Sequence, residues 1–195
     1  EIGRPLLDLA RQRAREQGQD IDFREGSAVA LPWDDESMDV CLLPELLEHV
    51  PDCRACVREC ARVLRAGGVL YLTTTNKLCP MQQEFDLPLY SWYPGFVKRF
   101  FERMVVTRWR SLVNYATYPA VNWFTFYSLR RELGELGFDR CLDRFELLRF
   151  SRRAPPMRFV LACIGAVPLI KWMGHVATPC TKIVAIKNFR RATKS

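Results

Sequence analysis

Residues 38–49 read MDVCLLPELLEH, and this stretch decides the fold. Met38 to Leu43 is a continuous apolar run, which is typical of a strand buried on both faces of a parallel sheet. Glu45 to His49 is then expected to begin a helical turn, and Asp52 is a favourable N-cap for a longer helix from Cys53 to Leu64. A buried strand that leads into a helix indicates an α/β protein.

The segments on either side continue the alternation of helix and strand. Helices are expected at 4–17 and 126–136, and strands at 21–24, 69–73, 138–148 and 181–187. The last two strands have no helix-length pattern fitting closely between them, so we expect an antiparallel edge strand there. The sequence therefore predicts an α/β, Rossmann-like, mostly parallel, doubly wound sheet in one domain over 1–195, with insertions at 78–120 and 149–177.

Length and composition fit a globular enzyme with one core. Of the 195 residues, 49% are hydrophobic and 26% are charged, which excludes disorder as the dominant state. The longest apolar run, Phe159 to Ile170, contains Pro168 and is shorter than the about 20 residues of a membrane-spanning helix. The eight cysteines do not form the dense framework of a small secreted domain, which favours reduced thiols in the cytoplasm.

Two ordered motifs carry a resemblance to a known family. Residues 23–52 read FREGSAVALPWDDESMDVCLLPELLEHVPD, and residues 63–76 read VLRAGGVLYLTTTN. Together they resemble the class I S-adenosylmethionine-dependent methyltransferases, and within them the ubiquinone-biosynthesis O-methyltransferase type. The resemblance covers nearly all of 1–150 and the closing strand. It implies a chain that begins after the family's first strand and glycine-rich loop, because none of the ten glycines forms a G-x-G.

The resemblance assigns the cofactor-binding residues for S-adenosyl-L-methionine. Glu1 stands where the family places an acid that binds the ribose hydroxyls. Ser27 replaces the usual aspartate beside the adenine amino group, with the Ala28 backbone N–H next to it, and Leu43 and Pro44 line the pocket. Glu1 as a frayed chain end, Ser27 in a simple loop and Leu43 in the core are the alternatives.

Glu45, Glu48 and His49 form the most informative local pattern. Positions i, i+3 and i+4 lie on one face of a helix, so the three side chains can converge there. In the ubiquinone-type enzymes the matching residues bind a metal, which implies a magnesium ion (Mg2+) that polarises an acceptor hydroxyl. Without a metal, His49 is the candidate general base, with Glu48 beside it. A charged, solvent-facing helix start is the alternative.

Two further groups of residues each allow a structural and a functional interpretation. Cys53, Cys56 and Cys60 lie on one helical stripe, but zinc sites take ligands from two separate segments, so core packing is the better interpretation. The polar run 73–76 ends a strand, where it either faces the acceptor pocket or caps a loop.

Charge is divided unevenly along the chain. Residues 1–97 carry 10 Lys/Arg against 16 Asp/Glu, whereas residues 98–195 carry 19 against 6. The stretch 89–110 interleaves Trp, Tyr and Phe with Lys and Arg, which suits an anionic membrane surface or a single-stranded nucleic acid. With 152–173 it is expected to form an interfacial lid; a basic face without a partner is the alternative.

These observations predict methyl transfer from S-adenosyl-L-methionine to a hydroxyl of a small-molecule or lipid-like acceptor, in the cytoplasm or peripherally at a membrane. A non-catalytic methyltransferase-like binding domain is one alternative. A nucleic-acid methyltransferase is less favoured, because residues 43–46 read LPEL and not the Asn/Asp-Pro-Pro-aromatic tetrad of base amino-group methylation.

Overall fold

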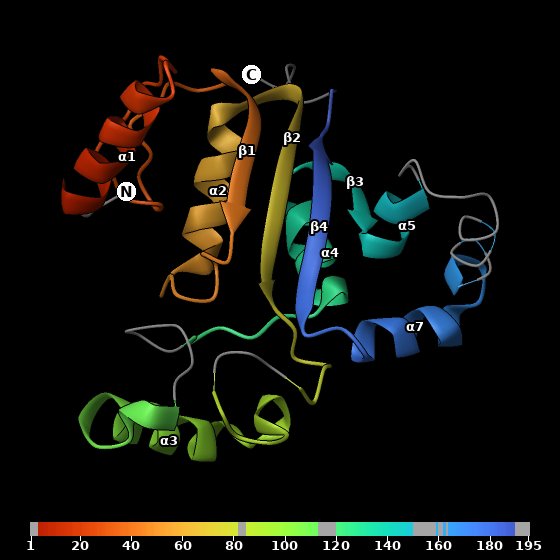
Figure 1. The fold of residues 1–195 in the computed structure, drawn as a ribbon. Coiled ribbons are helices and arrows are strands. Elements are labelled where there is room, and N and C mark those ends of the chain that lie inside the picture. The colour runs from red at the N-terminus through yellow and green to blue at the C-terminus, as the bar shows by residue number, and fades with distance from the viewer. Residues whose placement is uncertain are drawn as a thin grey trace.

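The central feature of the protein is a four-stranded mixed sheet (Figure 1). The structure, a computed structural model, describes residues 4–81, 85–112, 120–149, 159, 162 and 164–189. Its strands are β1 (Met38–Pro44), β2 (Leu64–Thr75), β3 (Phe138–Asp143) and β4 (Cys180–Lys187), in the spatial order β1-β2-β4-β3. β1 and β2 are parallel, and β4 is antiparallel to both β2 and β3. The mostly parallel α/β sheet is therefore confirmed, with its antiparallel strand between β2 and β3 and β3 at the edge.

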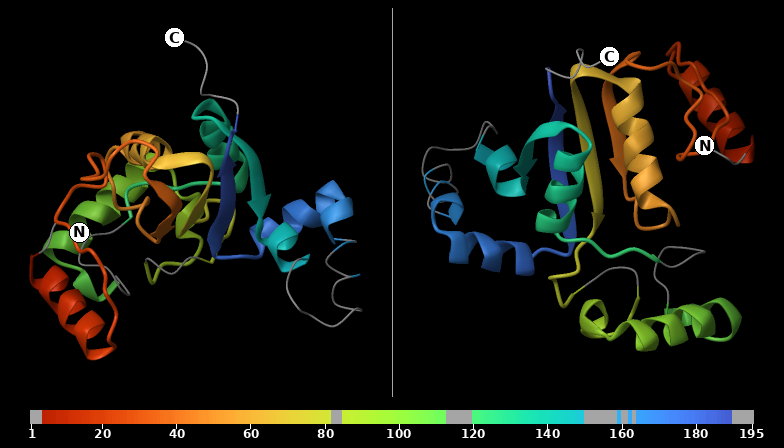
Figure 2. Two further views of the ribbon diagram at one scale, coloured as in Figure 1. Left: turned by 90° about the horizontal axis from the view of Figure 1, so that it is seen from above. Right: turned by 180° about the vertical axis from the view of Figure 1, so that it is seen from behind.

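One face of the sheet carries the main core. Helices α2 (Cys53–Val63) and α4 (Phe126–Glu135) cover this face, as the rear view in Figure 2 shows. The predicted cap of α2 is confirmed, because the Asp52 carboxylate accepts a 2.9 Å hydrogen bond from the Ala55 backbone N–H. Buried side chains from both helices and all four strands meet here, among them Leu43, Cys56, Cys60, Leu70, Leu72, Leu129, Leu133, Phe138 and Ile183.

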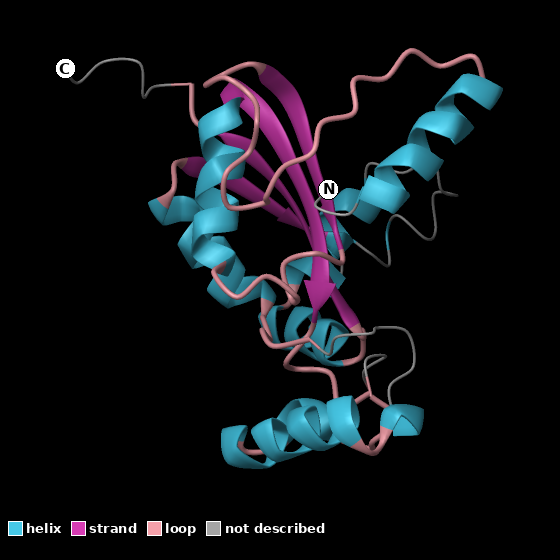
Figure 3. Cartoon of the chain, turned by 90° about the vertical axis from the view of Figure 1, so that its left-hand side faces the viewer, coloured by secondary structure: helices cyan, strands magenta, loops and turns pink. Residues whose placement is uncertain are grey.

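The opposite face of β1 is open. Val40 and Leu42 are 54% and 65% exposed, whereas Leu43, which points to the other side, is 4% exposed. Strand side chains alternate between the two faces, so this difference separates a covered face from an uncovered one. Helix α1 (Arg4–Glu16) stands to one side of the sheet (Figure 3).

A separate helical unit lies beyond the carboxyl ends of β1 and β2 (Figures 1 and 3). We call residues 85–112 the cap; it contains η1 (Tyr90–Trp92), α3 (Gly95–Thr107) and η2 (Arg110–Leu112). It has a small aromatic core of its own, built from Phe85, Tyr90 and Val105 with Leu87, Tyr93, Phe101, Leu112 and Trp123 packed against them. The cap falls within the predicted insertion 78–120.

Two predicted strands differ from the structure. Residues 21–24 form no strand, and no strand of the described residues lies beside them to supply hydrogen bonds. The strand predicted for 138–148 ends at Asp143, because this residue caps helix α5 (Arg144–Arg149). The Asp143 carboxylate accepts bonds from the backbone N–H groups of Phe145 and Glu146, and Glu146 accepts one from the Asp143 N–H.

Helix α7 (Pro168–Val176) lies within the second predicted insertion and leads directly into β4. A buried ion cluster joins it to the sheet: Lys171 Nζ lies 2.6 Å and His175 Nε2 3.4 Å from Asp143 Oδ2. The His175 ring stacks on Phe126 with 5.2 Å between the ring centres. No helix in the described part of the chain is long and apolar enough to span a membrane.

Candidate cofactor cleft

The segment after β1 is a tight turn and not the predicted helix. Glu45 has φ of 46°, a left-handed conformation that does not continue into an α-helix. Its N–H donates a 2.9 Å bond to the Thr73 carbonyl on β2, and the His49 N–H donates a 3.0 Å bond to Leu46. The prediction of one shared helical face for Glu45, Glu48 and His49 is therefore wrong.

A cleft of about 600 Å³ opens beside this turn. Residues of the loop 24–33 form one wall, and Leu46 with residues 49–52 form the other. Among the sequence-predicted site residues, Ser27, Ala28 and His49 all line this cleft. A mostly apolar cleft of this size with a few polar groups is typical of a site for a small molecule such as a nucleoside.

The loop wall is shaped by local contacts. Ser27 and Ala30 close a turn through a 3.0 Å hydrogen bond from the Ala30 N–H to the Ser27 carbonyl. The Arg24 guanidinium lies 3.9 Å from the centre of the Trp33 ring. Gly26 faces Pro32 so closely that a Cβ there would meet the proline Cδ at 2.7 Å. The Gly26-Ser27 pair of the sequence motif therefore gives the wall its close packing.

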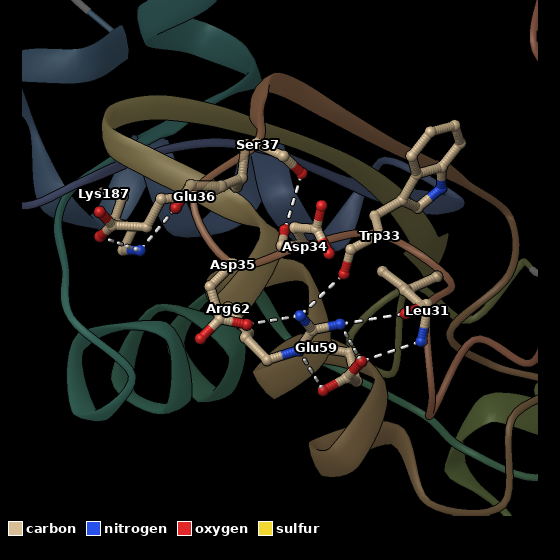
Figure 4. Close-up of polar contacts among 10 residues, drawn as sticks. Leu31, Trp33, Asp34, Asp35, Glu36, Ser37, Glu59, Arg62 and Lys187 are labelled. Carbon is tan, nitrogen blue, oxygen red and sulfur yellow. Dashed lines mark hydrogen bonds and ion pairs between the residues drawn. The ribbon is translucent and has the colours of Figure 1, made fainter.

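Arg62 fastens this wall to α2 (Figure 4). Its guanidinium donates to the carbonyls of Leu31 and Trp33 at 3.0 and 2.9 Å, and it pairs with Asp35 at 2.6 Å and Glu59 at 2.8 Å. Glu59 in turn accepts a 2.9 Å bond from the Leu31 N–H, and its hydrogen bond from Arg62 lowers the pKa of Glu59. Sequence reasoning missed Arg62, because Leu31, Trp33 and Asp35, which it binds, lie about 30 residues earlier in the chain.

Glu48 turns away from the cleft into the protein. It is fully buried, and its Oε2 accepts a 2.7 Å hydrogen bond from the Thr74 hydroxyl. Oε1 is buried with no hydrogen-bond partner among the described residues. Burial raises the pKa of Glu48 to about 7, and the nearby Glu45 carboxylate adds to this, although the Thr74 bond opposes it. A catalytic role for Glu48 stays a prediction.

The residues of this turn do not fit a magnesium ion. Over the ranges that the structure describes, no group of three His, Cys, Asp or Glu side chains is placed to hold a metal. Glu48 faces Thr74, whereas His49 faces the cleft. The predicted ligand set of Glu45, Glu48 and His49 is thus divided between two sides of the turn.

The remaining predicted cofactor residues take other places. Leu43 belongs to the main core, which agrees with the simpler interpretation, and neither Leu43 nor Pro44 lines the cleft. Glu1 lies outside the described residues. Cys56 and Cys60 are buried in the core, and Cys53 packs against it, as predicted.

The end of β2 joins the turn to the segment before α4. Thr73 and Thr74 bind the backbone of Glu45 and the side chain of Glu48, and Thr75 donates a 3.0 Å bond to the Asn122 carbonyl. Asn122, which the sequence analysis missed, donates through Nδ2 to Val50 at 2.7 Å. The run 73–76 therefore organises the carboxyl edge of the sheet. Its part in binding an acceptor stays a prediction.

Comparisons with known proteins agree with this architecture. The family model described as "Methyltransferase domain" matches residues 1–72. The ubiquinone biosynthesis O-methyltransferase of Parvibaculum lavamentivorans is 43% identical over 71 residues, which are 36% of this chain and 28% of that protein. The chain thus spans only about a third of the length of the curated relatives that it matches.

Two solved structures extend the likeness to nearly the whole chain. The YcgJ protein of Bacillus subtilis has a TM-score of 0.53 and 16% identity, covering 96% of this chain and 80% of that one. A SAM-dependent methyltransferase from Aquifex aeolicus has a TM-score of 0.51 and 9% identity, covering 96% and 66%. At these identities the likeness shows the fold alone.

Proposed function

We propose that this chain is a class I S-adenosylmethionine-dependent methyltransferase, which the family match over residues 1–72 supports, and that it transfers a methyl group to the hydroxyl of an amphiphilic acceptor. The observation that carries the proposal is the cleft beside β1, because Ser27, Ala28 and His49 line it together. The relatives named as ubiquinone O-methyltransferases support oxygen as the methylated atom.

The cleft suits the adenosine end of the cofactor. Its walls are mainly apolar, and the Ser27 hydroxyl and the Ala28 N–H offer hydrogen bonds to a purine edge. Arg62 keeps Leu31 and Trp33 in place through their carbonyls, so the cleft needs little rearrangement when a ligand enters.

His49 is the proposed general base for the acceptor proton. It lies at the cleft, directly after the turn that follows β1. The cofactor, when bound, would supply a sulfonium methyl group: the aligned acceptor oxygen would bond to the methyl carbon as the carbon–sulfur bond breaks and S-adenosylhomocysteine leaves. In this proposal an imidazole nitrogen of His49 takes the hydroxyl proton, while Glu48 stays behind the turn and holds it against Thr74.

The acceptor is proposed to come from an anionic membrane surface. Phe96, Arg99, Phe100 and Arg103 are exposed at helical spacing on one face of α3, with the two phenyl groups 70% and 53% exposed. Rings that enter the headgroup layer beside arginines that meet lipid phosphates suit such a surface. The cap lies beyond the carboxyl ends of β1 and β2 (Figure 1), and this position supports the proposal that the acceptor reaches the sheet edge from such a surface.

Calorimetric titration of S-adenosylhomocysteine into the chain tests the proposal. We expect binding that a Ser27→Leu variant weakens by about tenfold or more, since the leucine fills the cleft. A His49→Gln variant is expected to keep its affinity within about twofold and to lose most of the transfer rate at saturating cofactor, the pattern of a group that acts in the transition state.

The alternatives give different results. Binding that Ser27→Leu leaves unchanged would place the cofactor elsewhere. Cofactor binding without transfer to any amphiphilic phenol would favour a non-catalytic binding domain. Stronger retention of the protein by single-stranded DNA than by anionic vesicles would favour the nucleic-acid reading.

A further inference from the structure

A buried lysine in the cap has more donors than partners. Lys98 is only 8% exposed, although it lies on α3. Its Nζ donates one 2.8 Å hydrogen bond to the Ser91 carbonyl and lies 4.4 Å from the centre of the Trp123 ring. An ammonium group has three N–H donors, so two of them are left without a hydrogen-bond acceptor among the described residues.

Two neighbouring groups share this condition. The Ser91 hydroxyl and the Trp123 indole N–H are both buried with no hydrogen-bond partner in the described part of the chain. Ser91 is in direct contact with Lys98 through its carbonyl, and Trp123 through its ring. Buried polar groups are nearly always paired, and leaving one unpaired costs about 1–3 kcal/mol. Three such groups at one place point to a missing acceptor.

No carboxylate of the described residues supplies that acceptor. Glu102, one turn further along α3, acts on Lys98 only through space. Burial lowers the pKa of Lys98 to about 8, and the charge of Lys77 contributes. The cation is therefore desolvated without a full counterion. The electrostatic attraction between a bound anion and a buried lysine of this kind is stronger than that between an anion and an exposed lysine.

We propose that Lys98, Ser91 and Trp123 form a subsite for an oxyanion, a carboxylate or a phosphate, carried by the acceptor. The inference rests on the proposed function for the identity of its ligand as a methyl acceptor. It adds a chemical requirement that the cleft does not impose: the acceptor is acidic as well as amphiphilic.

The position of Trp123 links this subsite to the sheet edge. Its neighbour Asn122 binds the Val50 carbonyl, and Val50 lines the cofactor cleft. Its other neighbour, Phe124, forms a bridge with Asn76 at the end of β2. An anion bound by Lys98 would thus hold the acceptor between the cap and the carboxyl edge, on the side where His49 lies.

Three matched probes test the inference by calorimetry on the whole chain: 4-hydroxybenzoate, phenyl phosphate and 4-hydroxybenzyl alcohol. We expect one or both acids to bind at least about tenfold more tightly than the alcohol. The acid that binds more tightly identifies the preferred oxyanion. Lys98→Met should abolish this preference. Arg108→Met, which removes an exposed cation at the end of the same helix, should retain it.

Two milder variants keep the test valid if Lys98→Met fails to fold. Ser91→Ala and Trp123→Phe each remove one unpartnered donor. The first keeps the packing and should melt like the wild type, whereas the second also removes a ring that packs on the cap core and should melt a few degrees lower. Each should nevertheless weaken binding of the acid several-fold. An equal affinity for acids and alcohol, or a preference that all three variants retain, would overturn the inference.

S-adenosylhomocysteine binding separates this result from the proposed function. Cofactor binding without an acid preference would defeat the subsite alone. A Lys98-dependent acid preference without cofactor binding would defeat the methyltransferase proposal and leave an anion-binding protein.

Discussion

Thr74 on β2 donates a 2.7 Å hydrogen bond to the carboxylate of Glu48, which lies 26 residues earlier in the turn after β1. This bond joins the ends of two parallel strands at the edge where we propose that the cofactor and the acceptor meet. It is also a costly arrangement, because the carboxylate is fully buried and its second oxygen has no partner in the described residues.

Glu48→Gln is expected to change the pH dependence of stability. Burial raises the pKa of Glu48 to about 7, so the native state favours its protonated form. The wild type should therefore lose stability as pH rises from about 4.5 to 7, by up to about 3 kcal/mol, whereas glutamine is insensitive to pH.

Urea unfolding of both proteins at pH 5 and pH 8 measures the difference. Glu16→Gln, an exposed change on α1, is the control and should follow the wild type. Equal pH slopes for wild type and Glu48→Gln would contradict the burial argument.

Arg62→Ala is expected to loosen the cleft. The change removes the bonds that hold the Leu31 and Trp33 carbonyls on α2. We expect S-adenosylhomocysteine to bind about tenfold more weakly, because the wall must be ordered again when the ligand enters. Arg58→Ala removes an exposed arginine of the same helix and controls for loss of charge. Unchanged affinity in Arg62→Ala, measured by calorimetry, would show that the wall holds its shape by packing alone.

Asp143→Asn is expected to destabilise the protein by about 3 kcal/mol, since it leaves Lys171 and His175 beside an uncharged amide. Burial pushes the pKa of Asp143 upward, but the bonds from His175 and Lys171 outweigh it and lower the pKa to about 2. The pKa of Asp143 is thus lower in the native state than its value of about 4 in the unfolded chain. Ionised Asp143 therefore stabilises the protein above that pH, and this stabilisation is lost as the pH falls toward 2. The wild type should therefore unfold with acid over that window, and Asp143→Asn should show a flatter curve. Asp139→Asn, on the exposed side of β3, is the control and should unfold with acid as the wild type does. If acid unfolding of Asp143→Asn were as steep in pH as that of the wild type, this would count against the ion cluster.

Replacing Phe96 and Phe100 by serine is expected to weaken binding to vesicles of phosphatidylglycerol and phosphatidylcholine. Each phenyl group that enters the interface contributes about 1–2 kcal/mol, so the double variant should bind at least about tenfold more weakly. The matched change of Leu6 and Leu9, which are exposed on α1, should have little effect. Co-sedimentation measures both. Equal losses in the two double variants would indicate non-specific adsorption.

The sequence patterns predicted most elements because these depend on local signals. The apolar run of β1 and the Asp52 cap are each visible within a few residues. The turn at Glu45 was missed because its geometry depends on Thr73, which belongs to another strand. Asp143 was placed within a strand because its capping partner Glu146 lies in a stretch of apolar and charged residues that fits either structure.

In the candidate site too, residues within a local motif were predicted, whereas residues whose role depends on distant contacts were not. The family resemblance pointed to Ser27, Ala28 and His49, and all three line the cleft. Arg62 and Lys98 carry no motif, because their significance arises only when distant carbonyls and aromatic rings come together. A charged residue at a helical position is ordinarily solvent-facing, so nothing in the local sequence singles out either residue.

The place of β4 has a consequence for the order of folding. β3 reaches β2 only through β4, and β4 lies 37 residues or more after β3 along the chain. Until residues 180–187 leave the ribosome, β3 has no partner at that edge and cannot complete the sheet. Truncations or ribosome stalls before this strand should therefore expose the β4-facing edge of β2 to chaperones, and β3 should join the sheet only after residues 180–187 are released.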